Sequence, residues 1–237
     1  MCRKSVSKIL PLAVPVLGLG AAALRWALYA LGPDEKNMLP LWHPLQILQW
    51  VVVAAAAAGI LAFAGSRERT EPARGPAAGA GCLAMALALG VTALGAGGIY
   101  RILGLGAALC MLAAAWLCLR GGSTGGALHA VVCLFLAFHL VTRYRAWSGI
   151  AQMEDYVLPM LGSLTLMLFA YQQAALHAGV GRADHVNPAG LLACLFCLSA
   201  VTHTETPLLY AAGALWTVTN LPGEGKEEQE GTDDDPS

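Results

Sequence analysis

Residues 79–119 read GAGCLAMALALGVTALGAGGIYRILGLGAALCMLAAAWLCL, an apolar run with a single charged residue, Arg101. A helix crosses the hydrocarbon core of a bilayer in about 20 residues, so this run is too long for one crossing. An arginine at the centre of a membrane helix costs about 2.5–3.5 kcal/mol on insertion scales. The run therefore predicts two spans, at 79–99 and 102–119, that meet in a tight turn at residues 97–101.

Apolar stretches of membrane length recur on both sides of this pair, from Ile9 to Leu221. The sequence predicts an all-α, polytopic transmembrane helix bundle of eight spans, with six or seven as alternatives. A secretory signal is the competing interpretation of the first span, but its apolar run exceeds the roughly 7–15 residues of a signal core. The last two spans are short, and they decide between the alternative counts. The expected spans are 9–31, 45–65, 79–99, 102–119, 126–142, 156–177, 188–203 and 206–221.

The composition supports a membrane protein. Apolar residues make up 57% of the chain and charged residues 12%, against about 25% charged residues in soluble domains. The sequence has no dense run of Lys and Arg, so we expect no nucleic-acid partner. Residues 222–237 hold seven of the fifteen acids. This segment is too polar to fold, and we expect a disordered acidic tail behind one membrane domain of residues 1–221.

Basic residues predict the orientation of the bundle. With eight spans, the side with both termini receives Arg3, Lys4, Lys8, Arg67, Arg69, Arg74, Arg120, Arg182 and Lys226, and the other side receives Lys36, Arg101, Arg143 and Arg145. The positive-inside rule places the richer side in the cytoplasm. We therefore expect a multi-pass protein of the plasma membrane with both termini in the cytoplasm.

Small residues four positions apart predict where helices approach closely. Apolar burial does not drive helices together in lipid, so association depends more on close packing at such positions. The pairs are Gly18 with Ala22, Ala86 with Gly90, Ala93 with Gly97, and Gly104 with Ala108.

The sequence lacks complete motifs for catalysis, metals or cofactors. Cys194 and Cys197 have the CxxC spacing, but no second pair or adjacent His completes a zinc site. Residues 135–139 fit one motif of intramembrane prenyl-endopeptidase-like proteins, but the paired-glutamate motif of that family is missing. GxSxG, HExxH and P-loop motifs are also absent from the sequence. We expect no enzyme activity, no metal site and no cofactor.

Polar and aromatic residues crowd the span ends on the predicted outer side. Arginines collect there beside carboxylates, although the positive-inside rule makes them scarce on that side. Three interpretations stay open: an aromatic belt with snorkelling cations, a structural ion-pair network, and a solute-binding pocket. Arg25 lies inside the first span as a further intramembrane cation. The candidate ligand-binding residues are Arg101, Arg143, Arg145, Glu154, Asp155 and Glu205, beneath a rim of Trp42, Tyr100 and Trp147.

Residues 143–148, RYRAWS, continue to Asp155 and Tyr156 and into the sixth span. This segment resembles one found in uncharacterised bacterial polytopic membrane proteins. Residues 216–221, WTVTNL, add to the resemblance, which covers roughly the C-terminal third of the chain. The resemblance implies that the outer loop is a shared feature of the group. It implies no activity and no catalytic or binding residue.

Three hypotheses of function follow. The first is a non-enzymatic membrane protein that binds or passes a small solute through an outward-facing polar pocket, where Arg143 or Arg145 pairs with Glu154, Asp155 or Glu205. The second is a structural or accessory subunit whose small-residue faces dock a membrane-protein partner. The third, an intramembrane enzyme, ranks last because the sequence shows no nucleophile–base or metal constellation. The lipid bilayer is a partner in all three.

Overall fold

The computed structural model describes residues 2–31, 43–63, 70–148, 156–202 and 204–224, and these residues form eight helices. The described part of the tail forms a two-residue strand, β2 (Gly223–Glu224), that pairs antiparallel with β1 (Thr70–Glu71). By length and apolar composition, the first six helices are suited to cross a membrane, α1 over Ile9–Leu31. The helices are α1 (Cys2–Leu31), α2 (Pro44–Phe63), α3 (Pro76–Leu94), α4 (Gly98–Leu119), α5 (Gly126–Trp147), α6 (Val157–His177), α7 (Ala183–Ala200) and α8 (Pro207–Thr219).

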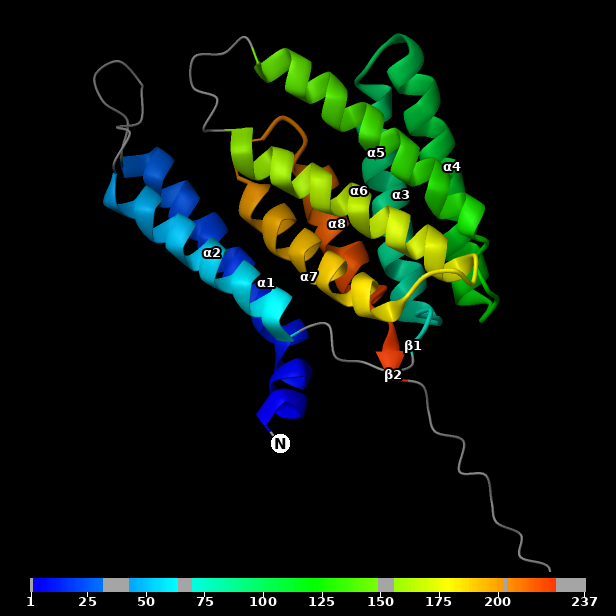
Figure 1. Cartoon of the computed structure of the whole chain (residues 1–237). Coiled ribbons are helices and arrows are strands. Elements are labelled where there is room, and N and C mark those ends of the chain that lie inside the picture. Colours follow the sequence, from blue (N-terminus) through cyan, green and yellow to red (C-terminus); the bar gives the residue numbers. More distant parts are fainter. Residues whose placement is uncertain (1, 32–42, 64–69, 149–155, 203, 225–237) are drawn as a thin grey trace, which may run out of the picture.

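Helices α3 to α8 form a closed ring. Each packs on the next along the chain, and α8 packs back on α3, while α6 also touches α8. The α1–α2 hairpin lies outside this ring and contacts it mainly through α7 (Figure 1). Successive helices alternate in direction. We call the end where α1, α3, α5 and α7 finish the outer end, and the end where they begin the inner end.

The two shortest helices, α7 and α8, are among the most buried. Helix α8 has 13 residues, or about 20 Å of length, which is less than the roughly 30 Å of a hydrocarbon core. Both helices carry buried polar side chains, such as Asn187, Ser199 and Thr217. Neighbouring helices shield these groups from lipid, which explains why α7 and α8 look least like membrane spans in the sequence.

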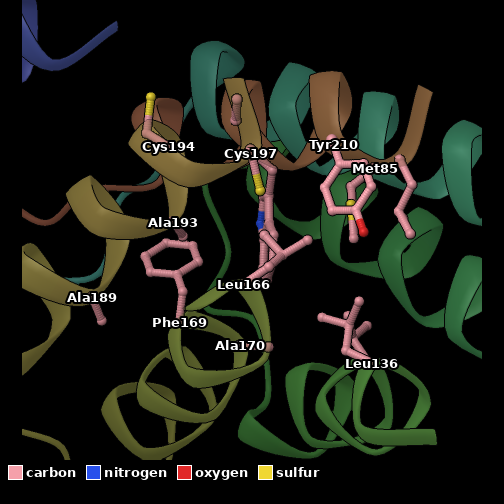
Figure 2. Packing of buried hydrophobic residues seen from close by; sticks show 14 of the residues in the cluster. Met85, Leu136, Leu166, Phe169, Ala170, Ala189, Ala193, Cys194, Cys197 and Tyr210 are labelled. Carbon is pink, nitrogen blue, oxygen red and sulfur yellow. The ribbon is translucent and has the colours of Figure 1, made fainter. Parts of the chain in front are cut away.

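Large side chains fill the interior of the ring. Figure 2 shows Phe169 of α6 near Ala193 of α7, and Tyr210 of α8 and Met85 of α3 belong to the same cluster of buried residues. The ring of Phe169 also meets the indole of Trp216 edge-on, with ring centroids 5.0 Å apart. The interior at this level is therefore a packed core.

The helix boundaries differ from the sequence expectation in two places that concern the candidate site. The turn between α3 and α4 comprises residues 95–97, so Tyr100 and Arg101 lie in the first turn of α4. Gly98, with a φ of 59°, starts that helix in a conformation that glycine adopts readily. Helix α5 continues five residues past the predicted end at 142, because a helix can extend beyond the apolar core with its charged residues. Arg143 and Arg145 are therefore helical.

Small residues mark some of the close helix contacts, as predicted. A Cβ atom at Gly104 would lie 2.6 Å from Cβ of Ala93 on α3, and one at Gly18 would lie 2.9 Å from Cβ of Leu198 on α7. Gly90 and Gly97 have open space at the same position. The small-residue pattern is therefore correct for Gly18 and Gly104 and wrong for Gly90 and Gly97.

We predict that Gly104→Ala destabilises the fold, while Gly106→Ala on the same helix does not. The added methyl group at position 104 overpacks the α3–α4 contact, which costs about 1–3 kcal/mol. Gly106 has no atom within 4 Å of its would-be Cβ, so alanine there gains up to about 1 kcal/mol of helix propensity. Equilibrium unfolding in mixed micelles measures both. Equal effects of the two substitutions would show that α3 and α4 are not in close contact at Gly104.

Candidate functional site

The predicted outer cluster does not gather into one pocket. Arg143, near the end of α5, forms an ion pair with Glu205, which precedes α8. The side chain of Arg143 is 22% exposed and that of Glu205 is 61% exposed. A pair this open to solvent contributes about 0–1 kcal/mol. This contact therefore links α5 to the α7–α8 turn without requiring a desolvated site.

The other predicted members are placed apart from this pair. Arg101 donates from Nε to the carbonyl of Ala96 at 2.8 Å and from a terminal nitrogen to the carbonyl of Leu94 at 3.2 Å. It therefore caps the end of α3. Arg145 is exposed and forms no ion pair with a described acid. Glu154, Asp155 and Trp42 lie outside the described residues.

Two members of the predicted aromatic rim are partly or fully buried. Trp147 is 3% exposed and stacks on Tyr156 with ring centroids 4.7 Å apart, so it joins the end of α5 to the start of α6. Tyr100 is half-buried, and its hydroxyl lies 2.5 Å from Nδ1 of His139 on α5. His139 is fully buried, one turn from Arg143. These side chains link helices rather than line an open mouth.

A polar contact also lies deeper in the ring. The hydroxyl of Tyr210 on α8 is 2.9 Å from Oγ of Ser163 and donates to the carbonyl of Pro159 at 3.0 Å. Because Ser163 and Pro159 belong to α6, this contact holds α8 against α6 near the outer end. A buried tyrosine hydroxyl needs such partners, so the contact is a structural one.

A small cavity lies between the α1–α2 hairpin and the start of α6. It has about 10 Å³ of space for the centre of a water molecule, which is room for about one water. Arg25 is 4% exposed at its wall, and its guanidinium carbon lies 5.7 Å from the ring centroid of Tyr29. The cavity is lined by Arg25, Leu28, Tyr29, Gln46, Gln49, Trp50 and Leu158.

Gln49 is the polar group that most needs explanation at this cavity. Its side chain is 3% exposed, and Nε2 has no hydrogen-bond partner among the described residues. A buried amide left without a partner costs about 1–3 kcal/mol. The sequence analysis identified Arg25 as an intramembrane cation. It could not show that one helix faces the other across a cavity.

A second polar group, at the inner end of the ring, was missed by the sequence analysis. The rings of His129 on α5 and His177 on α6 stack with centroids 4.8 Å apart, and Trp216 stacks on the other side of His129 at 6.0 Å. Oγ1 of Thr124 lies 3.4 Å from Nε2 of His129 and 2.9 Å from Nε2 of His177. The sequence offered one signal for this group. His129 lies near the start of α5 and His177 at the end of α6, which places both residues at the inner end.

These arrangements limit the chemistry that the described residues can perform. They contain no group of three or more His, Cys, Asp or Glu side chains that could hold a metal ion. The parallel imidazoles of His129 and His177 cannot both direct in-plane lone pairs at one ion. The outer cavity has donors and aromatic walls, and at its present size it has room for about one water molecule.

We predict a small coupling energy between Arg143 and Glu205. Because both side chains reach solvent, Arg143→Ala and Glu205→Ala, singly and together, should give a coupling of about 0–1 kcal/mol in unfolding free energy. A double-mutant cycle in detergent measures it. A coupling of about 3–5 kcal/mol would instead show a desolvated pair.

No known family model matches the chain, and no curated protein or solved structure shows significant similarity to it. The resemblance to uncharacterised bacterial polytopic membrane proteins therefore stays a prediction. We therefore infer a function from the geometry of the chain's own residues.

Proposed function

We propose that the protein is a non-enzymatic, multi-pass membrane protein that binds a small solute between the α1–α2 hairpin and the six-helix ring. The observation that carries this proposal is the unpartnered amide of Gln49 at the wall of a cavity. Polar groups inside a membrane domain are costly and commonly mark solute or ion sites. This proposal keeps the solute-binding hypothesis of the sequence analysis, but it places the site at Arg25 and Gln49 instead of Arg143 and Glu205.

The lining of the cavity indicates the class of solute. Gln49 carries an N–H donor without a partner at this wall, so the solute presents an oxygen acceptor. Tyr29 and Trp50 supply aromatic walls that suit a small carbon skeleton. A carboxylate or a neutral polyol meets both requirements, and binding measurements separate these two classes.

The α1–α2 hairpin is the part that must move to admit a solute larger than water. Only 22% of the apolar window of α2 is buried, the lowest share among the six candidate spans, and α1 is buried to 28%, the same share as α5 of the ring. The hairpin contacts the ring mainly through α7. A shift of this hairpin opens the cavity without repacking the core of the ring, in the way that rigid segments rock in transporters.

We further propose that the chain crosses the plasma membrane eight times and that both termini lie in the cytoplasm. The Arg143–Glu205 ion pair supports a full crossing by α7, because it ties the α7–α8 turn to the outer end of α5. At the inner end, Nδ2 of Asn220 donates to the carbonyl of Ala78 at 3.2 Å, which ties the end of α8 to the start of α3. Because α8 is shorter than the hydrocarbon core, residues that flank it cover the rest of the membrane thickness.

An accessory subunit is the second candidate, and the outward face of α2 favours it. Ala54, Ala55 and Ala58 are exposed there, and Gly59 has open space around its would-be Cβ. Such flat faces suit close docking of another membrane helix. This candidate requires a membrane-protein partner that co-purifies with the chain.

We predict that a small oxygen-bearing solute stabilises the purified protein through Gln49. A ligand at 100 times its dissociation constant adds about 2.7 kcal/mol of stability. Thermal midpoints in mild detergent, recorded with panels of carboxylates and polyols, identify the stabilising class. Gln49→Leu should remove the gain.

Gln172→Leu, a substitution near the inner end of α6, is the matched control and should keep the gain. If a solute stabilised wild type and Gln49→Leu equally, the site would lie elsewhere. If no solute stabilised the protein and a membrane protein co-purified in stoichiometric amount, the accessory-subunit proposal would replace this one.

We predict the orientation from single cysteines at two exposed serines. In a cysteine-free background, Ser148→Cys should react with an impermeant reagent on intact cells, and Ser123→Cys should react only after permeabilisation. Thr204→Cys should behave like Ser148→Cys if α7 and α8 both cross. Reversed labelling at 123 and 148 would invert the orientation. Protection at 204 alone would remove the last two spans.

A further inference from the structure

The last turn of α4, at the inner end of the ring, holds an exposed arginine against an exposed tryptophan. The guanidinium carbon of Arg120 lies 4.2 Å from the ring centroid of Trp116. The side chain of Trp116 is 57% exposed, and Arg120 is exposed as well. A cation over the face of an indole is attracted by the negative potential of the ring. The stack therefore favours one orientation of the guanidinium and keeps it on the outside of the bundle.

The side chain of Arg120 is not needed to cap α4. The N–H of Gly122 donates to the carbonyl of Leu117 at 2.9 Å, and the N–H of Gly121 donates to that of Cys118 at 3.0 Å. With Gly121 at a φ of 72°, these two bonds form a Schellman motif. Among the described residues, the side chain of Arg120 forms no ion pair. Its N–H donors are therefore available to a ligand.

A second exposed arginine lies beside this end of α4. The N–H of Gly75 donates to the carbonyl of Cys118 at 3.3 Å, so the backbone holds Arg74, the preceding residue, next to the last turn of α4. Arg74 also forms no ion pair with a described acid, whereas Arg182, another exposed residue of the inner end, pairs with Asp184 at 3.2 Å. The inner end of the α3–α4 pair therefore presents two positive charges that the described acids do not neutralise.

The exposed face of α4 that leads to this end is apolar. Large exposed side chains recur there at every third or fourth position, which is one face of a helix. They are Leu105, Leu109, Leu112, Trp116 and Leu119. From Leu105 to Trp116 the helix rises about 17 Å, which is close to half of the roughly 30 Å hydrocarbon core. The face therefore matches the acyl chains of one leaflet, and Arg120 lies at the depth of the headgroups.

We propose that Arg120, with Trp116 and Arg74, binds the phosphate of an anionic phospholipid whose acyl chains lie along this face of α4. A guanidinium offers paired N–H donors whose geometry matches phosphate oxygens. Basic residues at the ends of membrane helices attract anionic headgroups. The apolar face favours a lipid over a free phosphate, which would use the charges alone. This site is separate from the solute cavity, which lies between the α1–α2 hairpin and α6 at the outer end.

Native mass spectrometry of the full-length protein in mild detergent tests the proposal. The protein is titrated with phosphatidylglycerol or with phosphatidylcholine of the same acyl chains, and the lipid adducts are counted. We expect wild type to bind phosphatidylglycerol about 5-fold or more tightly than phosphatidylcholine, because each arginine near the surface favours an anionic lipid by about that factor. Arg120→Gln should remove most of this preference. Trp116→Leu should weaken binding of phosphatidylglycerol about 2- to 5-fold, through loss of the stack.

Arg182→Gln is the matched control, because it removes the same charge from the same end of the bundle at a residue already paired with an acid. It should leave the preference unchanged. Circular dichroism and the thermal midpoint check that Arg120→Gln is folded, which we expect for an exposed side chain. Glycerol 3-phosphate at the concentration of the lipid should not compete. A preference that Arg120→Gln retains, an equal loss in Arg182→Gln, or full competition by glycerol 3-phosphate would overturn the proposal.

Discussion

The hydrogen bonds of Asn220 close the ring on which the rest of the structure depends. Its amide donates to the carbonyl of Ala78 on α3, and its own carbonyl accepts from Nε2 of Gln173 on α6 at 2.7 Å. Lipid supplies no apolar driving force between helices, and interhelical hydrogen bonds contribute about 0.6–2 kcal/mol each. At Gly81, a Cβ would lie 1.9 Å from Oγ1 of Thr219 and 3.1 Å from Cα of Trp216, so glycine at this position lets α8 approach α3 closely. Close packing and these bonds act at the same place.

Closure by α8 explains where polar groups are tolerated. A helix too short to face lipid over its whole length can carry Thr217 and Asn220, because α3, α6 and α7 cover it. The same closure positions Trp216, which stacks on His129. The hairpin contacts the ring mainly through α7. Its looser attachment is consistent with a cavity that forms at its seam with the ring.

The sequence predicted the helices better than their partners. Span lengths located all eight helices, since apolar runs of membrane length leave few alternatives. Charge at the outer end pointed to a contact such as Arg143 with Glu205, because both residues flank span ends on one side. It also placed Trp147 on an aromatic rim, and the structure buries that residue against Tyr156. Apolarity alone does not tell an interfacial tryptophan from one that packs between two helices.

The neighbours that carry the proposed function could not be found in this way. Helical spacing gives each residue a face but no neighbour on another helix. The visible CxxC spacing instead drew attention to Cys194 and Cys197 on α7. Gln49 and Arg25 likewise needed the crossing of α1 and α2 before their shared cavity could be seen. In a bundle without a soluble domain among its described residues, such interhelical neighbours decide where chemistry can occur.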